Sequence, residues 1–337
     1  MAGSVEKKRL FGYDALKALA AFFVVLYHVG MVDLGYRDGQ YYFPTLVQVI
    51  WLLCACGVPL FFMVNGALTV HRGYDLKKTA IKVGRLVLAG VFWGLMVIGL
   101  KTFVRHEPFS LSLLVGNIDY YWFLFTLAAL YVINYILSLL PHWCRWVVVA
   151  VLLIYPFITN LAWDIVTLRD PGTHLHSWRT GFFTLYGLVY LYAGDFLRQR
   201  HACKWLLLLC VILGLGLLAL EATAFANRYH HDFETGNYAF PTIGALLLTI
   251  ALFLWLRDCD LPQFPGLKRC ITFLGNNVLG IYIFHLMLMI VVGAFLPAGM
   301  GKVHPFVAVL VALAYMIVSA GISELIRRSP AGFLLKL

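Results

Sequence analysis

Long apolar stretches dominate this chain, and polar residues gather in short segments between them. Many of the stretches approach or exceed about 20 residues, the length an α-helix needs to cross the hydrocarbon core of a bilayer. The ten stretches cover 13–32, 46–70, 80–104, 120–140, 145–161, 180–197, 204–226, 238–256, 271–295 and 304–326. The fifth is short and contains Pro156. The pattern predicts an all-α, polytopic integral membrane protein with about ten transmembrane helices.

Composition agrees with this fold class. Apolar residues make up 62% of the 337 positions and charged residues 12%, which excludes an ordinary water-soluble domain. The first apolar stretch is long and carries charges, so we expect a retained span and not a cleaved signal peptide. The loops are short, without Ser/Gly/Pro-rich linkers or an internal repeat. A single membrane domain over 1–337 is predicted.

The positive charges predict the topology. If the N-terminus is cytoplasmic, 18 of the 26 Lys and Arg lie on the inner side, and the positive-inside rule then places both termini in the cytoplasm. The net charge of +10 is thereby explained without a nucleic acid partner. The inner residues are Lys7, Lys8, Arg9, Arg72, Lys77, Lys78, Lys82, Arg85, Arg145, Arg198, Arg200, Lys204, Arg257, Lys268, Arg269, Arg327, Arg328 and Lys336.

The outer segments and the cysteines add little chemistry. The longest outer segments, 33–45, 105–119, 162–179 and 227–237, carry acidic and aromatic residues that suit either the bilayer interface or sugar binding. None of the seven cysteines lies in an outer loop, so no disulfide framework is predicted. Cys54 and Cys56 would point about 200° apart on a helix, and we expect no metal site.

Three ionisable residues, Asp14, Lys17 and His28, lie inside the first apolar stretch. Charges at bilayer depth are costly and usually serve a function. Eleven helical steps return His28 to within about 20° of the face of Lys17, about 16 Å along the axis. One stripe of this helix thus carries a cation near the cytoplasm and an imidazole deeper, an arrangement that suits a molecule lying along it.

Each of these residues has a structural and a functional interpretation. His28 is either a buried histidine bonded to a neighbouring carbonyl or a general base, since a neutral imidazole in an apolar cavity can take a proton from a hydroxyl. Lys17 either pairs with Asp14 or snorkels to the interface, or it anchors a phosphate. Asp14 can orient Lys17 in both cases.

Three further groups of residues are candidates for binding. Asn65 and Gly66 place an amide and a close-approach position inside the second span. The basic residues after it, Lys78, Lys82 and Arg85, share one helical face and form either topogenic charge or a clamp for a polyphosphate. In the ninth span, Tyr282 and His285 share a helix face at i, i+3. They are either substrate contacts or packed core residues.

In this order, the segments resemble the membrane-bound acyltransferase family 3. The family opens with Asp-x-x-Arg/Lys, ten residues and His, as in Asp14, Lys17 and His28. The second span resembles the Phe-Phe-x-x-Ser-Gly pattern in Phe61-Phe62-Met63-Val64-Asn65-Gly66, and an R-x-x-R element is approximated by Lys82-Val83-Gly84-Arg85. A Trp-Phe-Leu segment looks like Trp122-Phe123-Leu124, with Tyr131 beyond it, and a late Tyr/His element looks like Tyr282-Ile283-Phe284-His285. Lysine at position 17 replaces the more usual arginine, within the tolerance of the family pattern, and asparagine at position 65 replaces serine.

The resemblance implies a surface-polysaccharide O-acetyltransferase in the bacterial cytoplasmic (inner) membrane. Acetyl-CoA would be the acyl donor, without a metal, and a lipid-linked or surface glycan the acceptor. It implies His28, Asp14 and Lys17 as catalytic residues and Lys17, Lys78, Lys82 and Arg85 as donor-binding residues. Acceptor or oxyanion contacts would come from Asn65, Trp122, Tyr282 and His285. The resemblance leaves open which hydroxyl is acylated and how long the acyl chain is. It also leaves open whether the acyl group passes directly or through an acyl-enzyme, and whether the protein forms a homo-oligomer. The alternative is a proton-coupled transporter that uses Asp14, Lys17 and His28 as a relay.

Overall fold

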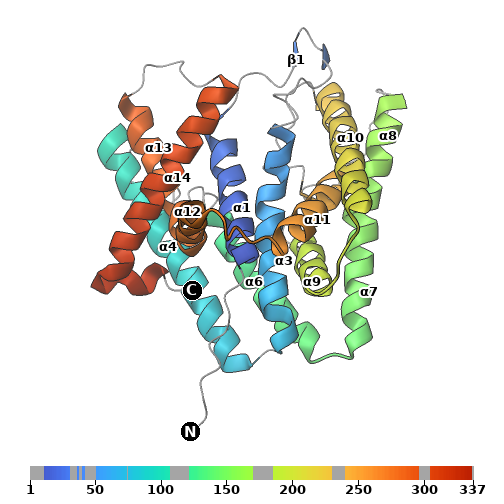
Figure 1. Ribbon diagram of the computed structural model, residues 1–337, viewed down its shortest axis with the longest axis horizontal. Helices are drawn as coiled ribbons and strands as arrows, with labels where there is room; N and C mark the ends of the chain where they lie inside the picture. The colour runs from blue at the N-terminus through green and yellow to red at the C-terminus, as the bar shows by residue number, and fades with distance from the viewer. Residues whose placement is uncertain are drawn as a thin grey trace.

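The computed structural model describes residues 11–30, 36–37, 40–41, 51–73, 75–106, 121–169, 185–229, 240–295 and 304–335 (Figure 1). The basic residues at 7–9 and most of the four predicted outer segments lie outside these ranges. The described chain is helical apart from an antiparallel pair of two-residue strands, β1 (Tyr36–Arg37) and β2 (Gln40–Tyr41). The helices are α1 (Phe11–Val29), α3 (Gly57–Thr69), α4 (Leu76–Arg105), α6 (Trp122–Ser138), α7 (His142–Leu152), α8 (Thr159–Arg169), α9 (Tyr186–Leu197), α10 (Lys204–Tyr229), α11 (Ile243–Arg257), α12 (Pro265–Asn276), α13 (Val278–Phe295) and α14 (Pro305–Arg328), with the shorter turns η1 (Cys54–Cys56), η2 (Val70–Arg72), η4 (Leu153–Ile158) and η6 (Pro330–Leu335).

The predicted fold class is confirmed: the chain is an all-α, polytopic membrane protein. Within the described residues, seven helices are long and apolar enough to cross a membrane. They are Phe11–Val29, Trp51–Arg72, Leu76–Arg105, His142–Trp163, Lys204–Phe225, Val278–Phe295 and Pro305–Arg328. The shorter helices α6, α9 and α11 occupy three further predicted spans. Pro156, which interrupts the fifth span in the sequence, lies in the π-helical turn η4 between α7 and α8, and the span continues through it.

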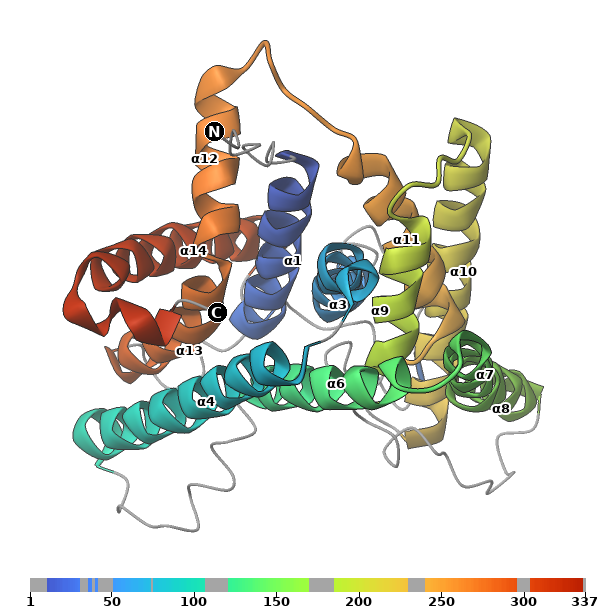
Figure 2. The same cartoon turned by 90° about the horizontal axis from the view of Figure 1, so that it is seen from below.

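The ninth predicted span, 271–295, is wrong as a single helix, because the structure divides it into α12 and α13. Asn277 lies at the junction, where its Nδ2 donates to the Phe273 carbonyl and its Oδ1 accepts from Ser323 Oγ at 2.9 Å. The basic residues of α12 and the polar junction do not suit the hydrocarbon core. Figure 1 shows α12 end on while α7 and α8 run up the page, and Figure 2 shows it lengthwise. The helix therefore lies across the direction of these spans.

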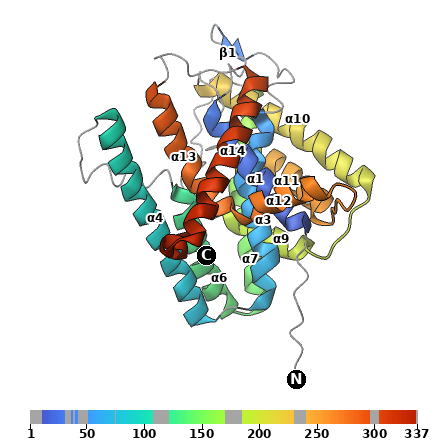
Figure 3. The same ribbon diagram turned by 60° about the vertical axis from the view of Figure 1, so that its left-hand side comes forward.

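Helices α1 and α3 form the centre of the bundle, as Figure 2 shows. Helix α1 packs against α3, α11, α12, α13 and α14, and α3 packs along α9. The α3–α9 crossing is a backbone contact, because a Cβ at Gly66 would collide with the Leu191 carbonyl and one at Gly194 with the Met63 carbonyl. The expected close approach at Gly66 is thus observed. Helices α4 and α13 lie side by side at one edge, and α10 lies at the opposite edge (Figure 3).

Candidate active site

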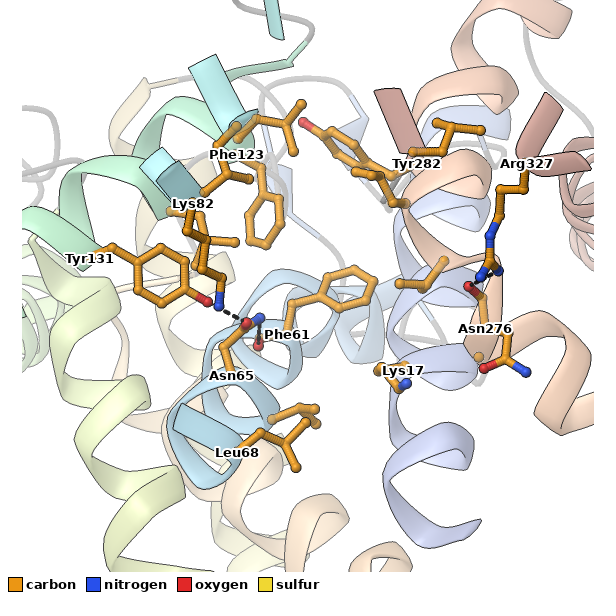
Figure 4. A pocket seen from close by; sticks show the side chains of 18 residues that line it. Lys17, Phe61, Asn65, Leu68, Lys82, Phe123, Tyr131, Asn276, Tyr282 and Arg327 are labelled. Atoms are coloured by element: carbon orange, nitrogen blue, oxygen red, sulfur yellow. Dashed lines mark hydrogen bonds between the residues drawn. The ribbon is translucent and has the colours of Figure 1, made fainter. Parts of the chain in front are cut away.

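A cavity of about 400 Å³ lies among α1, α3, α4, α6, α12, α13 and α14 (Figure 4). Its lining combines apolar and aromatic side chains with three cations, Lys17, Lys82 and Arg327. No carboxylate is among the described residues that line it. A cavity of this charge and shape favours a negatively charged molecule that also has an apolar portion.

Lys17 and Arg327 bring positive charge to one side of the cavity. The Nζ atom of Lys17 lies 2.8 Å from Oδ1 of Asp14, one helical turn earlier, and Asp14 is buried. Gly275 of α12 packs against the backbone of Asp14, where any side chain would collide. Arg327 Nη1 donates to the Asn276 carbonyl at 3.0 Å. Lys17 therefore has its ion pair and also faces the cavity, so its two interpretations are compatible.

Lys82 brings the third cation to the opposite side, held by a chain of contacts through Asn65 (Figure 4). The Lys82 ammonium lies 4.0 Å from the centre of the Tyr131 ring. The Tyr131 hydroxyl donates to Asn65 Oδ1 at 2.8 Å, and Asn65 Nδ2 donates to the Phe61 carbonyl at 2.8 Å. The amide that replaces serine in the family pattern thus orients Tyr131, and Tyr131 supports the cation.

Tyr282 connects the cavity to two histidines. It lines the cavity, and its ring centre lies 6.2 Å from that of His285, one turn further along α13. His285 in turn packs against His28 of α1, with ring centres 5.2 Å apart. Two histidines from opposite ends of the sequence therefore meet beside the cavity, although neither lines it.

Each of the two histidines forms a hydrogen bond with the backbone carbonyl four residues earlier in its own helix. Nδ1 of His28 lies 2.7 Å from the Val24 carbonyl, and Nδ1 of His285 lies 2.8 Å from the Ile281 carbonyl. Because a carbonyl only accepts, each Nδ1 carries the proton and each neutral ring keeps a lone pair at Nε2. His285 is fully buried, and its Nε2 has no hydrogen-bond partner in the described part of the chain. His28 is exposed. Each Nε2 can thus accept a hydrogen bond.

Besides Asp14 and the two histidines, three further residues that the sequence suggested lie outside the cavity lining. Lys78 lines a neighbouring open pocket of about 530 Å³ together with Arg72, and this pocket shares Lys82 and Tyr131 with the cavity. Arg85 is exposed and lines neither pocket. Trp122 packs against Phe240 with ring centres 5.9 Å apart. The cations that line this open pocket are therefore Arg72, Lys78 and Lys82, and Arg85 is not among them.

Residues that the sequence reasoning did not assign to the site also line the cavity. Arg327 was counted only as topogenic charge, and Asn276 only as part of an apolar span. Tyr131 was noted only in the family resemblance. Of these residues, only Asn276 has a local sequence signal for a role in the site, because two adjacent asparagines at 276–277 are unusual in a transmembrane span. The contacts of Tyr131 and Arg327 are long-range, and no sequence pattern points to them.

The residues that the structure describes hold no group of three or more His, Cys, Asp and Glu side chains arranged to bind a metal ion. Cys54 and Cys56 are buried thiols in the turn η1.

Comparison with known proteins gives one match. Residues 10–326 match a protein family described as an acyltransferase domain. No curated protein and no solved structure matches the chain.

Proposed function

The chain belongs to the acyltransferase 3 family, and we propose that it moves an acetyl group from cytoplasmic acetyl-CoA to a sugar hydroxyl of a lipid-linked or cell-surface glycan. The observation that carries this proposal is the family match over nearly the whole chain. A membrane acyltransferase needs an acyl donor and an acceptor. The finer assignments below follow from the charge and shape of the cavity.

The cations of the cavity support a donor with phosphates. Coenzyme A has a polyphosphate end and a long, narrow arm that ends in the thioester. We place its phosphates between Lys17 and Lys82, with Lys78 in the adjoining pocket. An ammonium binds phosphate as a point charge, and three of them suit a flexible polyphosphate. The arm then extends past Tyr282 toward His28.

The histidines support acyl transfer to a hydroxyl. In the proposed step, His28 Nε2 takes the proton of the acceptor hydroxyl while the hydroxyl oxygen attacks the thioester carbonyl carbon. The C–S bond breaks, and coenzyme A leaves as a thiolate that takes up a proton. Tyr282, which lies between the cavity and the histidines, is the proposed donor to the oxyanion. Asn65 lies beside Lys82 at the phosphate end, where it accepts from Tyr131. His285 suits a contact to the acceptor hydroxyl, because its Nδ1 proton is held by the Ile281 carbonyl and the lone pair at Nε2 can accept a hydrogen bond.

The transporter alternative uses the same Asp14, Lys17 and His28, and it predicts no thioester chemistry. Family membership favours the enzyme. We further place both termini in the cytoplasm and the protein in a bacterial inner membrane, on the charge distribution that the sequence shows.

Purified protein given radiolabelled acetyl-CoA and a crude lipid-linked glycan fraction tests the proposal. Wild-type protein should bind the donor and label the glycan. His28→Ala should keep donor binding and lose about 10²- to 10⁴-fold in rate, as expected for a missing general base. His142→Ala, on the exposed start of α7, is the matched control and should keep its rate. Protein that neither binds acetyl-CoA nor consumes it is not the proposed enzyme, and full activity in the His28 variant removes this histidine from the mechanism.

A further inference from the structure

A separate basic pocket of about 740 Å³ lies between α12 and α14. Four cations line it, Lys268 and Arg269 from α12 and Arg327 and Arg328 from α14, with a single carboxylate, Glu324. Of the cations, only Arg327 also lines the central cavity. The pocket has no role in the proposed transfer, and four cations line it, against three in the central cavity and three in the neighbouring open pocket.

Ion pairs neutralise only part of this charge. Lys268 pairs with Asp260, and Arg328 Nε lies 2.9 Å from Glu324 Oε1. Arg327 donates to the Asn276 carbonyl, which is a neutral partner. Arg269 is exposed and forms no ion pair with any residue that the structure describes. Two guanidinium groups therefore remain available in one pocket, and a guanidinium fork matches the oxygens of a phosphate.

Exposed apolar side chains surround the pocket. Phe273 lines the pocket and is 38% exposed, and Leu325 beside Glu324 is 71% exposed. Phe264, which precedes α12, and Leu267, in its first turn, are also exposed. Because α12 lies across the direction of the spans (Figures 1 and 2), it has the composition and the orientation of an amphipathic helix at a membrane surface. A ligand here meets positive charge and hydrocarbon together.

We propose that this pocket binds the phosphate headgroup of an anionic membrane lipid, with Arg269 and Arg327 on the phosphate and the acyl chains along Phe273 and Leu325. Basic pockets between transmembrane helices are known sites for such headgroups. The apolar rim favours a lipid over a soluble phosphate such as the nucleotide end of acetyl-CoA. Arg327 lines both sites, so the bound headgroup lies next to one wall of the cavity. This proposal does not depend on the reaction that the protein catalyses.

Binding of short-chain lipids to the purified full-length protein in detergent tests the site. The probes are dihexanoyl phosphatidylglycerol, dihexanoyl phosphatidylcholine and coenzyme A, each titrated by thermophoresis. Wild-type protein should bind the phosphatidylglycerol and not the zwitterionic lipid. Arg269→Gln/Arg328→Gln removes two cations of the pocket that do not line the cavity, and it should weaken phosphatidylglycerol binding roughly 30-fold. Arg269→Gln alone, at an exposed position without an ion pair, should weaken it by about fivefold and is expected to fold normally.

The matched control is Arg200→Gln/Lys204→Gln, which removes two exposed cations between α9 and α10. It should bind phosphatidylglycerol as the wild type does. If the control variant loses as much phosphatidylglycerol affinity as the pocket variant, the lipid is attracted by the net charge of the protein alone, and the proposal is overturned. Unchanged lipid binding in both pocket variants would do the same. If the pocket variants lose coenzyme A binding and keep lipid binding, the pocket belongs to the acyl donor.

Discussion

Two side chains in this protein are oriented by their own helices. Asp14 fixes Lys17 from one turn away, and the Val24 carbonyl fixes the proton position on His28. Local hydrogen bonds of this kind hold a group in place before any substrate arrives, which lowers the cost of ordering it during the reaction. The single helix α1 can thus present a cation to the cavity and an imidazole beside it.

Neutralising the Asp14–Lys17 pair should weaken donor binding specifically. Removal of Lys17 alone would take away the cation that pairs with the buried Asp14 carboxylate, so the variant is Asp14→Asn/Lys17→Gln. We expect the dissociation constant for acetyl-CoA to rise about tenfold or more, since a charge-assisted contact to phosphate is lost. Isothermal titration measures this constant.

The matched control is Asp195→Asn/Arg198→Gln, an i, i+3 pair on α9 outside the cavity. It should leave the constant unchanged. Wild-type affinity in the Asp14/Lys17 variant would exclude Lys17 from the donor site.

Helix–helix contacts determine where the cavity lies. The glycines of the α3–α9 crossing bring two backbones together without side chains, and the neighbouring Asn65 of α3 accepts a hydrogen bond from Tyr131 of α6. Gly275 allows the same closeness between α12 and α1. Small residues have this role widely in membrane helices, because lipid provides no hydrophobic force to pull helices together.

Gly66→Ala should destabilise the protein by about 1–3 kcal/mol, because the added methyl group collides with a backbone carbonyl that cannot rotate away. Thermal unfolding in detergent, followed by circular dichroism, measures the change. Gly216→Ala is the control: its Cβ would meet open space, and alanine favours a helix over glycine, so this variant should be as stable as the wild type or slightly more. A Gly66 variant as stable as the Gly216 variant would contradict the close crossing.

The bundle as a whole predicts which cysteines are reachable from each side of the membrane. Cys203 and Cys270 are exposed free thiols near the basic ends of α10 and α12. If the positive-inside topology holds, a membrane-impermeant maleimide should label them only after the membrane is opened. Ser110→Cys, in a predicted outer segment, should be labelled in intact cells and serves as the control. Labelling of Cys203 in intact cells would reverse the orientation.

The sequence predicted the helical membrane fold well, because hydrophobic length is a local property. It also placed Lys17 and His28 on one helix face, since helical geometry fixes that spacing. It did not predict that His28 meets His285, or that Tyr131 bonds to Asn65, because these contacts depend on how distant helices pack. The break between α12 and α13 was missed because the apolar residues around Asn276 and Asn277 outweighed two amides in a hydropathy reading.

The α3–α9 crossing has a mechanical consequence. Two backbones in direct contact leave no room for sliding or rotation, so these helices move as one rigid wall. We therefore expect rearrangements that admit a bulky substrate to involve other parts of the lining, such as the long, rotatable side chains of Lys82 on α4 and Arg327 on α14. A cross-link between α3 and α9 should therefore leave turnover unchanged, because it joins two backbones that already touch.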